Sequence, residues 1–464
     1  MNKQSLQSCL SYIDSYWNKI ILKPKHFRKG RQIVEQVLFI PKEIIDNKQV
    51  ISVPYTCIVP NLEKFSHIFY WDTYFMFRGI LGTRYEWVIP SMVENFIYLF
   101  KKYQIIPNLT HAESLGRSQP PFLSSMILDA YGVILRSKKL TAHIQKLIVT
   151  PREWLMERMT YAQQEYITVW QNAAGYNHFV PEYKLNRYGN TDVGYAQDSE
   201  QESGWDMTSR FYNRCNQFLP IDLNCFLYKY ERDFSHVAQL LNQKRHTFRW
   251  DETAKFRADR INNLMWNDSL GFYMDYDYVH KRQSEFMSLA GFIPLWAGIA
   301  SFEQAKRMKT HLKRFETAYG LTITDKASLL PREITFENLP KPYQTTVTEA
   351  FQHKQWDYPH IWPPLEYLTV VGLLRYGFVS DAKRIMEKSL QANITIFQKY
   401  HALLEKMDGT TGDMPSSFWY PTQKGFGWTN ATVFRYTQFL EALDNQTLYD
   451  KESNTYPRLI STFY

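Results

Sequence analysis

The sequence predicts an all-α protein of one domain, and three observations carry that prediction. Apolar residues recur at helical spacings of three and four through most of the chain after about residue 60. Alternating strand patterns are scarce over the same stretch, and no Pro-, Ser- or Gly-rich linker divides it. With 44% hydrophobic and 16% aromatic residues, the 464-residue chain can bury a large core.

The predicted helices can be followed in chain order. Apolar stripes run from Ile89 to Tyr103 and from Leu223 to Leu241. Ser380-Asp381 is typical of a helix start, and its stripe continues towards Leu404. Thr429-Asn430 indicates the start of a further helix. A few short strands are expected in the loops, at 36–39, 50–53 and 272–276. We expect residues 1–60 to form an N-terminal segment that packs on a helical domain of residues 61–464.

Composition and spacing exclude several classes of protein. The net charge of +8 is spread along the chain, and the clearest basic cluster, Lys23–Arg31, is short, so we expect no nucleic-acid partner. No run of about 18 apolar residues could span a membrane, and no secretory signal is recognisable, which predicts a cytoplasmic protein. The four cysteines lie far apart and are expected to be free thiols.

Cofactor and nucleotide motifs are also missing from the sequence. The 12 histidines show no tight ligand spacing, so neither a metal nor another cofactor is expected. There is no Gly-x-Ser-x-Gly elbow, P-loop or dinucleotide fingerprint. A hydrolase that uses only carboxylates and water remains.

Four acidic residues lie in aromatic, loop-like stretches rather than on solvated helix faces: Asp72, Asp206, Asp357 and Glu405. The three aspartates each follow a Trp, and a carboxyl group beside an indole is poorly solvated, which raises its pKa towards neutral pH. For any one Trp-Asp pair, a helix cap or an ion pair with Arg is the simpler interpretation. Cleavage of a glycosidic bond, however, needs one such proton donor and a second carboxylate.

Two motifs resemble those of the trehalase family. The segment 202–211, Glu-Ser-Gly-Trp-Asp-Met-Thr-Ser-Arg-Phe, is similar to the family's segment with the catalytic acid, and 425–430 reads Gly-Phe-Gly-Trp-Thr-Asn as in the family's C-terminal stretch. Further segments resemble trehalase segments in the same order along the chain: 70–75, 106–108, 117–121, 222–224, 355–359 and 362–365. The resemblance covers about residues 60 to 440.

The resemblance implies an (α/α)6 toroid, the six-hairpin glycosidase architecture, and hydrolysis with inversion. Asp206 then takes the position of the general acid and Glu405 that of the general base, and an inverting pair lies about 6.5–9.5 Å apart. The positions implied to contact the sugars are Trp71, Asp72, Asn108, Arg117, Gln119, Trp205 and Trp362, with Trp362 as a stacking wall.

The chain departs from the family pattern at three places. The family's Pro-Gly-Gly-Arg-Phe segment corresponds to Val59–Phe65, which contains no arginine, so we expect a donor to sugar hydroxyls to be lost. Trp419 stands where the family usually has Glu, and His360-Ile361 replaces a small-residue turn. These changes concern the sugar subsites more than the acid and base.

Three functions are compatible with these residues and motifs. The leading hypothesis is a monomeric α,α-trehalase that cleaves the disaccharide to two glucoses. The second keeps the chemistry but acts on a related α-glycoside, such as glucosylglycerate or mannosylglycerate, and predicts a cationic contact in the pocket for the glycerate carboxylate. The third is a carbohydrate-binding pseudoenzyme without turnover.

Overall fold

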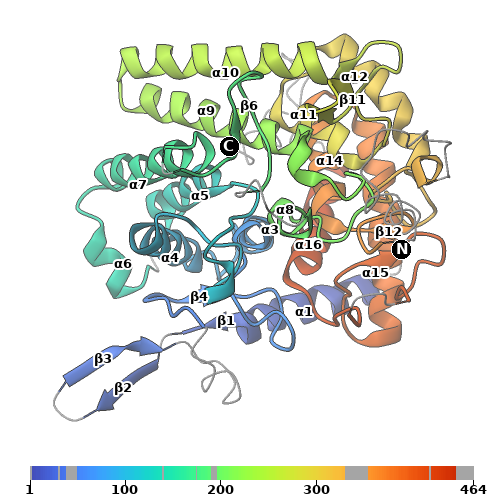
Figure 1. Ribbon diagram of the computed structural model, residues 1–464. Helices are drawn as coiled ribbons and strands as arrows, with labels where there is room; N and C mark the ends of the chain where they lie inside the picture. Colours follow the sequence, from blue (N-terminus) through green and yellow to red (C-terminus); the bar gives the residue numbers. More distant parts are fainter. Residues whose placement is uncertain are drawn as a thin grey trace.

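The computed structural model describes residues 3–23, 25–29, 32–37, 50–137, 140–173, 175–189, 196–329, 354–416 and 420–445. Within these ranges the regular structure is mainly helical, and every strand outside one N-terminal hairpin is two residues long. The all-α prediction is therefore confirmed (Figure 1).

An inner ring of helices surrounds the centre of the molecule. Its members are α3 (Tyr70–Ile80), α5 (Leu123–Arg136), α9 (Ile221–Leu240), α11 (Ile293–Ala297), α14 (Pro363–Arg375) and α16 (Gly427–Asp444). Starting at α3, the ring runs through α16, α14, α11 and α9 to α5, each packed on the next. It closes where Tyr74 of α3 stacks on Phe122, directly before α5, with ring centroids 4.2 Å apart. Arg78 of α3 also pairs with Asp129 of α5.

A second layer of helices covers this ring. It comprises α1 (Lys3–Ile20), α4 (Val88–Tyr103), α7 (Pro151–Glu165), α10 (Lys244–Met265), α12 (Phe302–Lys309) and α15 (Val379–Tyr400). In this layer α4 and α7 pack on α5, α10 on α9, α15 on α14, and α1 on α16. Inner helices such as α3 and α14 are buried nearly throughout, whereas α15 buries mainly one face, which explains its clear apolar stripe.

The predicted helices match four observed ones. The stripe from Ile89 is α4, and the stripe from Leu223 is α9. Helix α15 ends at Tyr400, short of Leu404, because His401 adopts a left-handed conformation with φ 54° and its N–H bonds to the Phe397 carbonyl. Helix α16 begins at Gly427, two residues before Thr429.

Short elements connect the helices. The strands form small antiparallel pairs: β1 (Ile21–Leu22) with β4 (Cys57–Ile58), β2 (Lys25–Lys29) with β3 (Gln32–Val37), β5 (Phe179–Val180) with β6 (Leu185–Asn186), β10 (Tyr276–Asp277) with β7 (Phe218–Leu219) and β11 (Arg282–Gln283), β8 (Trp266–Asn267) with β9 (Phe272–Tyr273), and β12 (His360–Ile361) with β13 (Met407–Asp408). Helices α6 (Ala142–Leu147) and α8 (Ala196–Ser203) lie in connections, with a π-helix, η2 (Tyr166–Trp170), and 3-10 turns at η1 (Ala112–Ser114), η3 (Cys215–Gln217), η4 (Leu289–Phe292), η5 (Thr310–Arg314) and η6 (Lys326–Leu329).

The strand predictions met different outcomes. The stretch 36–39 overlaps the end of β3, and its last two residues lie outside the described ranges. The stretch 272–276 is divided between β9 and β10. The prediction for 50–53 is wrong, because Val50 makes only a single bridge to His111.

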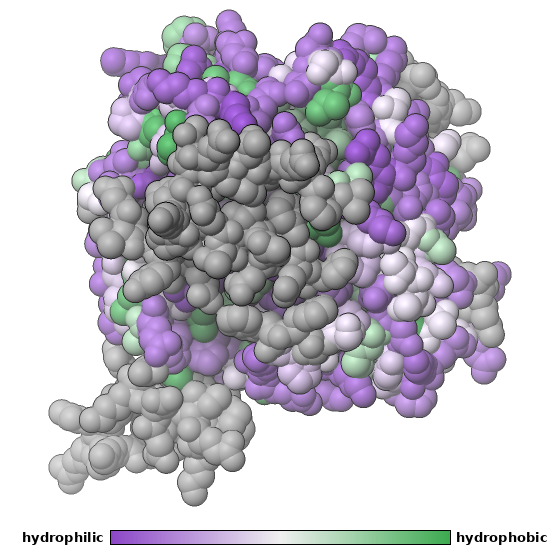
Figure 2. All heavy atoms as spheres, turned by 45° about the vertical axis from the view of Figure 1, so that its right-hand side comes forward, coloured by the Kyte–Doolittle hydropathy of each residue, from purple (hydrophilic) through white to green (hydrophobic). Residues whose placement is uncertain are grey.

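The N-terminal helix is joined to the rest of the chain by specific contacts. Tyr16 of α1 donates a hydrogen bond to the Gly425 carbonyl at 2.7 Å, and β1 pairs with β4. Among the coloured residues of Figure 2, hydrophilic side chains dominate the surface and hydrophobic ones are scattered. No helix in the described part of the chain is long and apolar enough to cross a membrane.

Candidate active site

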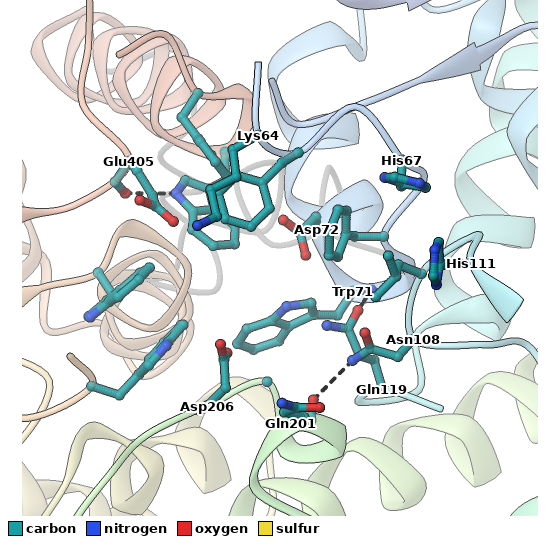
Figure 3. Close-up of a pocket in the computed structure, with 18 of the residues that line it drawn as sticks. Lys64, His67, Trp71, Asp72, Asn108, His111, Gln119, Gln201, Asp206 and Glu405 are labelled. Atoms are coloured by element: carbon teal, nitrogen blue, oxygen red, sulfur yellow. Dashed lines mark hydrogen bonds between the residues drawn. The ribbon is translucent and has the colours of Figure 1, made fainter. Parts of the chain in front are cut away.

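Loops at one end of the helical ring enclose a cavity of ≈ 370 Å³. This volume lies in the range of about 300–1,000 Å³ that is usual for small-molecule sites. Figure 3 shows that Asp206 and Glu405 project into this cavity from different chain segments. The side chains that line it include most of the predicted site residues: Trp71, Asp72, Asn108, Arg117, Gln119, Asp206, Trp362 and Glu405.

Asp206 follows helix α8 on a tightly packed loop. Gly204 has a φ of +74°, and a Cβ there would lie 2.7 Å from the Trp71 indole, so the loop requires glycine at this position. Gln355 donates one hydrogen bond to the Asp206 carbonyl at 3.0 Å and a longer one of 3.3 Å to Oδ2. Burial raises the pKa of Asp206 to about 6, and the Glu405 charge also raises it. A carboxyl group in this state can donate a proton near neutral pH.

The loop after Asp206 is held by the Gln-Trp-Asp segment. The Asp357 carboxylate accepts hydrogen bonds from the Ser209 N–H at 2.9 Å, from the Ser209 hydroxyl at 2.6 Å and from the Thr208 hydroxyl at 3.1 Å. The Trp356 N–H donates to the Met207 carbonyl at 3.1 Å. Asp357, which resembled Asp206 in its sequence context, therefore positions the loop that carries Asp206 and does not itself line the cavity.

A buried ion-pair cluster lies beside this loop. Arg210 is fully buried and bonds to Asp222 and to Asp275, each with a contact of 2.7 Å. Its guanidinium lies 4.5 Å from the centre of the Trp205 ring. The structure does not bring the indole of Trp205, a predicted sugar contact, to the cavity, because this ring is buried between Arg210 and Trp356.

Glu405 has a different set of partners. Tyr420 donates a hydrogen bond to Oε1 at 2.5 Å, and Lys406 Nζ lies 3.4 Å from Oε2. Burial lowers the pKa of Lys406, but the ammonium also lies 4.7 Å from the Trp362 ring centre and 4.5 Å from that of Tyr420. The hydroxyl donor and the lysine therefore fix the orientation of the Glu405 carboxyl group in the cavity.

The backbone of the base segment is fixed by the last inner helix. Trp428 Nε1 donates to the Glu405 carbonyl at 2.8 Å, and the Thr429 hydroxyl donates to the Leu404 carbonyl at 2.7 Å. The family-like Gly-Phe-Gly-Trp-Thr-Asn stretch thus orients Glu405. His360-Ile361, which departs from the family pattern, forms strand β12 and pairs with strand β13 just after Glu405. This pairing joins the segment of Asp357 to the segment of Glu405.

Polar side chains on the opposite wall come from α3 and the 106–121 segment. Gln119 Oε1 accepts the Trp71 N–H at 3.1 Å, and Asn108 Nδ2 donates to the Gln201 carbonyl at 2.9 Å. These contacts tie the predicted sugar-binding residues to α3 and α8. Burial raises the pKa of Asp72 well above its usual value, and the charges of Asp206 and Glu405 raise it further.

Indole rings form the apolar walls. Trp356 and Trp362 stack in parallel, with centroids 3.8 Å apart and an interplanar angle of 6°. Trp71 lies 5.8 Å from Trp356 and Trp428 lies 5.8 Å from Trp362, so the four rings are contiguous. Such faces suit the apolar C–H surfaces of sugar rings.

Two positions that differ from the family pattern lie in or near the segments of the cavity. The lost arginine does not leave the site without a basic group, because Lys64, directly before Phe65, lines the cavity. A lysine therefore lines the cavity at the end of the segment that lacks the family's arginine. Trp419 lies outside the described residues.

Several lining residues were not predicted. Trp356, Phe426 and Trp428 lie within motifs that resemble the family, so their sequence context could have identified them. His67, His111 and Tyr420 lie in segments without a recognisable signal, and only the folded chain brings them to the cavity. In the described part of the chain, no group of three or more His, Cys, Asp or Glu side chains is arranged to hold a metal ion.

Comparison with known proteins agrees with the geometry. A family model described as Trehalase matches residues 1–203 and 195–442. The structure is similar to neutral trehalase Nth1 from Saccharomyces cerevisiae, with a TM-score of 0.70 and 26% identity over 94% of this chain and 81% of that one.

The mannosylglycerate hydrolase of Thermus thermophilus in complex with glucose is similar in fold, with a TM-score of 0.57 and 17% identity over 85% of this chain and 98% of that one. Because the family model matches nearly the whole chain, this protein belongs to the trehalase family, and its helices form the (α/α)6 toroid of the six-hairpin glycosidases.

Proposed function

We propose that this protein is an inverting glycoside hydrolase that cleaves α,α-trehalose to two glucoses. The observation that carries the proposal is the placement of two carboxyl groups in one cavity, with the pKa of Asp206 raised to about 6 and Glu405 hydrogen-bonded by the Tyr420 hydroxyl. Membership of the trehalase family and the similarity to a yeast neutral trehalase favour trehalose as the disaccharide.

In the proposed reaction, Asp206 protonates the bridging oxygen as the glycosidic bond breaks. Glu405 takes a proton from a water molecule, which attacks the anomeric carbon from the opposite face. No hydrogen bond joins the two carboxyl groups, and their segments approach the cavity from different directions, as an intervening water requires. One water is consumed and two glucose molecules are released.

The proposal includes a cytoplasmic, monomeric enzyme. Supporting the location, Cys9, Cys57, Cys215 and Cys225 are all free and buried, as is usual for proteins of reducing compartments.

The test is hydrolysis of trehalose, with the anomeric form of the released glucose followed by NMR. We expect β-glucose as the first product from the attacked ring. First appearance of α-glucose from that ring would contradict inversion. Glucose release at the same background level from the wild type and from Asp206→Asn would instead favour the carbohydrate-binding pseudoenzyme.

A further inference from the structure

A buried carboxylate joins the helix before Asp206 to the segment that carries Arg117 and Gln119. Glu202 lies in the last turn of α8, is fully buried and does not line the cavity. Its Oε1 accepts a hydrogen bond from the Ser118 N–H at 2.9 Å. Ser118 stands between Arg117 and Gln119, both of which line the cavity. Glu202 therefore connects two cavity-lining segments without lining the cavity itself.

The same two segments are joined a second time, at the cavity. The Asn108 side chain donates to the Gln201 carbonyl at 2.9 Å, as Figure 3 shows. The Asn108 N–H in turn donates to the Arg117 carbonyl at 3.0 Å. Bonds at the neighbouring residues Gln201 and Glu202 thus hold α8 to this segment at two points. The bond at Glu202 has a charged acceptor, and such hydrogen bonds are the stronger ones.

The other oxygen of Glu202 binds donors from a different part of the chain. Oε2 lies 2.9 Å from His178 Nε2, directly before β5, and accepts the Gly189 N–H at 2.6 Å, after β6. Gly189 has a φ of +95°, and a Cβ there would lie 2.2 Å from Ser199 Oγ, so this close approach to α8 requires glycine. Helix α8 is thereby held between the 117–119 segment and the loops that flank β5 and β6.

The hydrogen-bond geometry fixes how many protons His178 and Glu202 share. His178 is fully buried, and its Nδ1 lies 3.0 Å from the Val169 carbonyl, which can only accept, so Nδ1 carries a hydrogen. Nε2 faces a carboxylate oxygen, so a second hydrogen lies between these two atoms. Although burial raises the pKa of Glu202, the His178 charge and the hydrogen bonds from His178, Gly189 and Ser118 lower it below its usual value. The two side chains therefore form an imidazolium–carboxylate pair.

We propose that Glu202 and His178 are positioning residues that hold Asp206 in register with the cavity-lining residues Arg117 and Gln119. Asp206 follows Glu202 closely, on a tightly packed loop, so a shift at the end of α8 moves the acid relative to a bound sugar. A misplacement of about 1 Å can lower a rate by about 10²-fold. This inference rests on the proposed function and adds to it two residues that do not touch the substrate.

The first test replaces the acceptor. Glu202→Gln removes the charge and places an amide NH2 against the N–H of Ser118 or of Gly189. We expect kcat on trehalose to fall by about tenfold or more, because the acid is displaced. On α-glucosyl fluoride, whose leaving group needs little protonation, the loss should be smaller, so the ratio of the two kcat values should change by about fivefold or more. A merely structural role would lower both activities together.

The matched control is another buried glutamate with several donors. Glu94 of α4 is buried and accepts hydrogen bonds from Trp154 and Arg158, but among the described residues none from α4 lines the cavity. Glu94→Gln should therefore lower the thermal stability and leave the ratio of the two kcat values unchanged.

His178→Gln and His178→Asn separate the two hydrogen bonds of the imidazole. The amide nitrogen of Gln reaches about as far as Nε2 and can still donate to Glu202, whereas that of Asn reaches as far as Nδ1, which bonds to Val169. We expect His178→Asn to change the ratio of kcat values as Glu202→Gln does, and His178→Gln to stay closer to the wild type. Circular dichroism and thermal unfolding verify that each variant is folded. If Glu202→Gln does not fold, the two His178 variants decide.

Failure of this inference is distinguishable from failure of the proposed function. A wild-type ratio in both Glu202→Gln and His178→Asn, or an equal change of the ratio in Glu94→Gln, would overturn the positioning role, while hydrolysis of trehalose by the wild type keeps the proposed function. If the wild type hydrolyses neither trehalose nor α-glucosyl fluoride, the proposed function itself fails, and the positioning role falls with it.

Discussion

The two carboxyl groups of the cavity, Asp206 and Glu405, have different surroundings. Asp206 has aromatic neighbours and accepts at Oδ2 a long hydrogen bond of 3.3 Å from the Gln355 side chain. Glu405 is more deeply buried, with 1% of its surface exposed, whereas Asp206 is partly buried; Glu405 also receives the Tyr420 hydroxyl at 2.5 Å and has Lys406 at 3.4 Å. The comparison shows that two carboxyl groups of one cavity differ both in exposure and in the hydrogen-bond donors around them.

The two sides also differ in how the backbone is held. The acid's loop depends on a buried carboxylate, Asp357, which accepts bonds from Thr208 and Ser209. The base segment depends instead on donors from α16, where Trp428 and Thr429 bond to its carbonyls. Strand β12, which follows Asp357, pairs with β13, which follows Glu405. This pairing connects the anchor of the Asp206 loop with the Glu405 segment and so fixes the separation of the two segments.

Replacing each catalytic residue should give the largest effect and should separate their roles. Asp206→Asn is expected to lower kcat on trehalose by about 10²–10⁴-fold, the usual contribution of general acid catalysis. On α-glucosyl fluoride the same variant should retain most activity, because fluoride leaves with little need for protonation. Glu405→Gln should lose activity on both substrates, since both require an activated water. Steady-state kinetics on the two substrates measure the difference.

Equal losses of both variants on the fluoride would contradict the assignment of Asp206 as the acid. Both replacements keep the side-chain size, so circular dichroism should show unchanged helix content.

Removing the acid's anchor should have the next largest effect. Asp357→Asn places an amide where the Ser209 N–H, the Ser209 hydroxyl and the Thr208 hydroxyl now donate, and leaves buried donors unpaired. We expect a loss of about 1–3 kcal/mol in the free energy of unfolding, measured by urea denaturation. Activity on trehalose should fall more than activity on α-glucosyl fluoride, because the acid is displaced but the base is not. A fall of the same factor on both substrates would argue against a role confined to the acid's side.

Much of this comparison could be predicted from the sequence. Helices α4 and α9 carry apolar residues at helical spacing, so their stripes predicted them, and the resemblance of the Ser-Gly-Trp-Asp segment to trehalases singled out Asp206, which lines the cavity. The distinction between Asp206 and Asp357 could not be predicted, since both follow Trp in aromatic surroundings. Only the contact of Asp357 with a loop about 150 residues earlier separates their roles.

Three of the residues that line the cavity were equally inaccessible to sequence patterns. His67, His111 and Tyr420 reach the cavity from separate loops, and no periodicity links residues on different loops. Trp205 is the reverse case: it was expected to contact the sugar because it precedes Asp206, but its side chain packs on Arg210. Adjacent residues in an extended loop need not face the same way.

A smaller effect should follow from removing the donor that distinguishes the base. Tyr420→Phe deletes the hydroxyl bonded to Glu405 Oε1 and leaves the ring in place. Since a hydrogen bond to a charged group contributes about 1.5–3 kcal/mol, we expect kcat to fall by about tenfold or more, on trehalose and on α-glucosyl fluoride alike. Tyr400→Phe, whose hydroxyl bonds to Asp413 outside the cavity, is the matched control. Loss on trehalose alone would place Tyr420 on the acid's side of the comparison.

The smallest predicted effect is a displacement of the pH profile that tests the electrostatic link between the two sides. With the pKa of Asp206 at about 6, kcat/KM should decline as pH rises above about 6, because the proton-donating form is lost.

The nearby Lys406 charge lowers the pKa of Asp206, so Lys406→Met should raise it and move this decline to higher pH. Lys306→Met, on the surface of α12, should leave the decline in place. The pH dependence of kcat/KM for both variants measures the shift. A decline that moves to lower pH in Lys406→Met would mean that the group losing its proton there is not Asp206, and the contrast between the two carboxyl groups would need another origin.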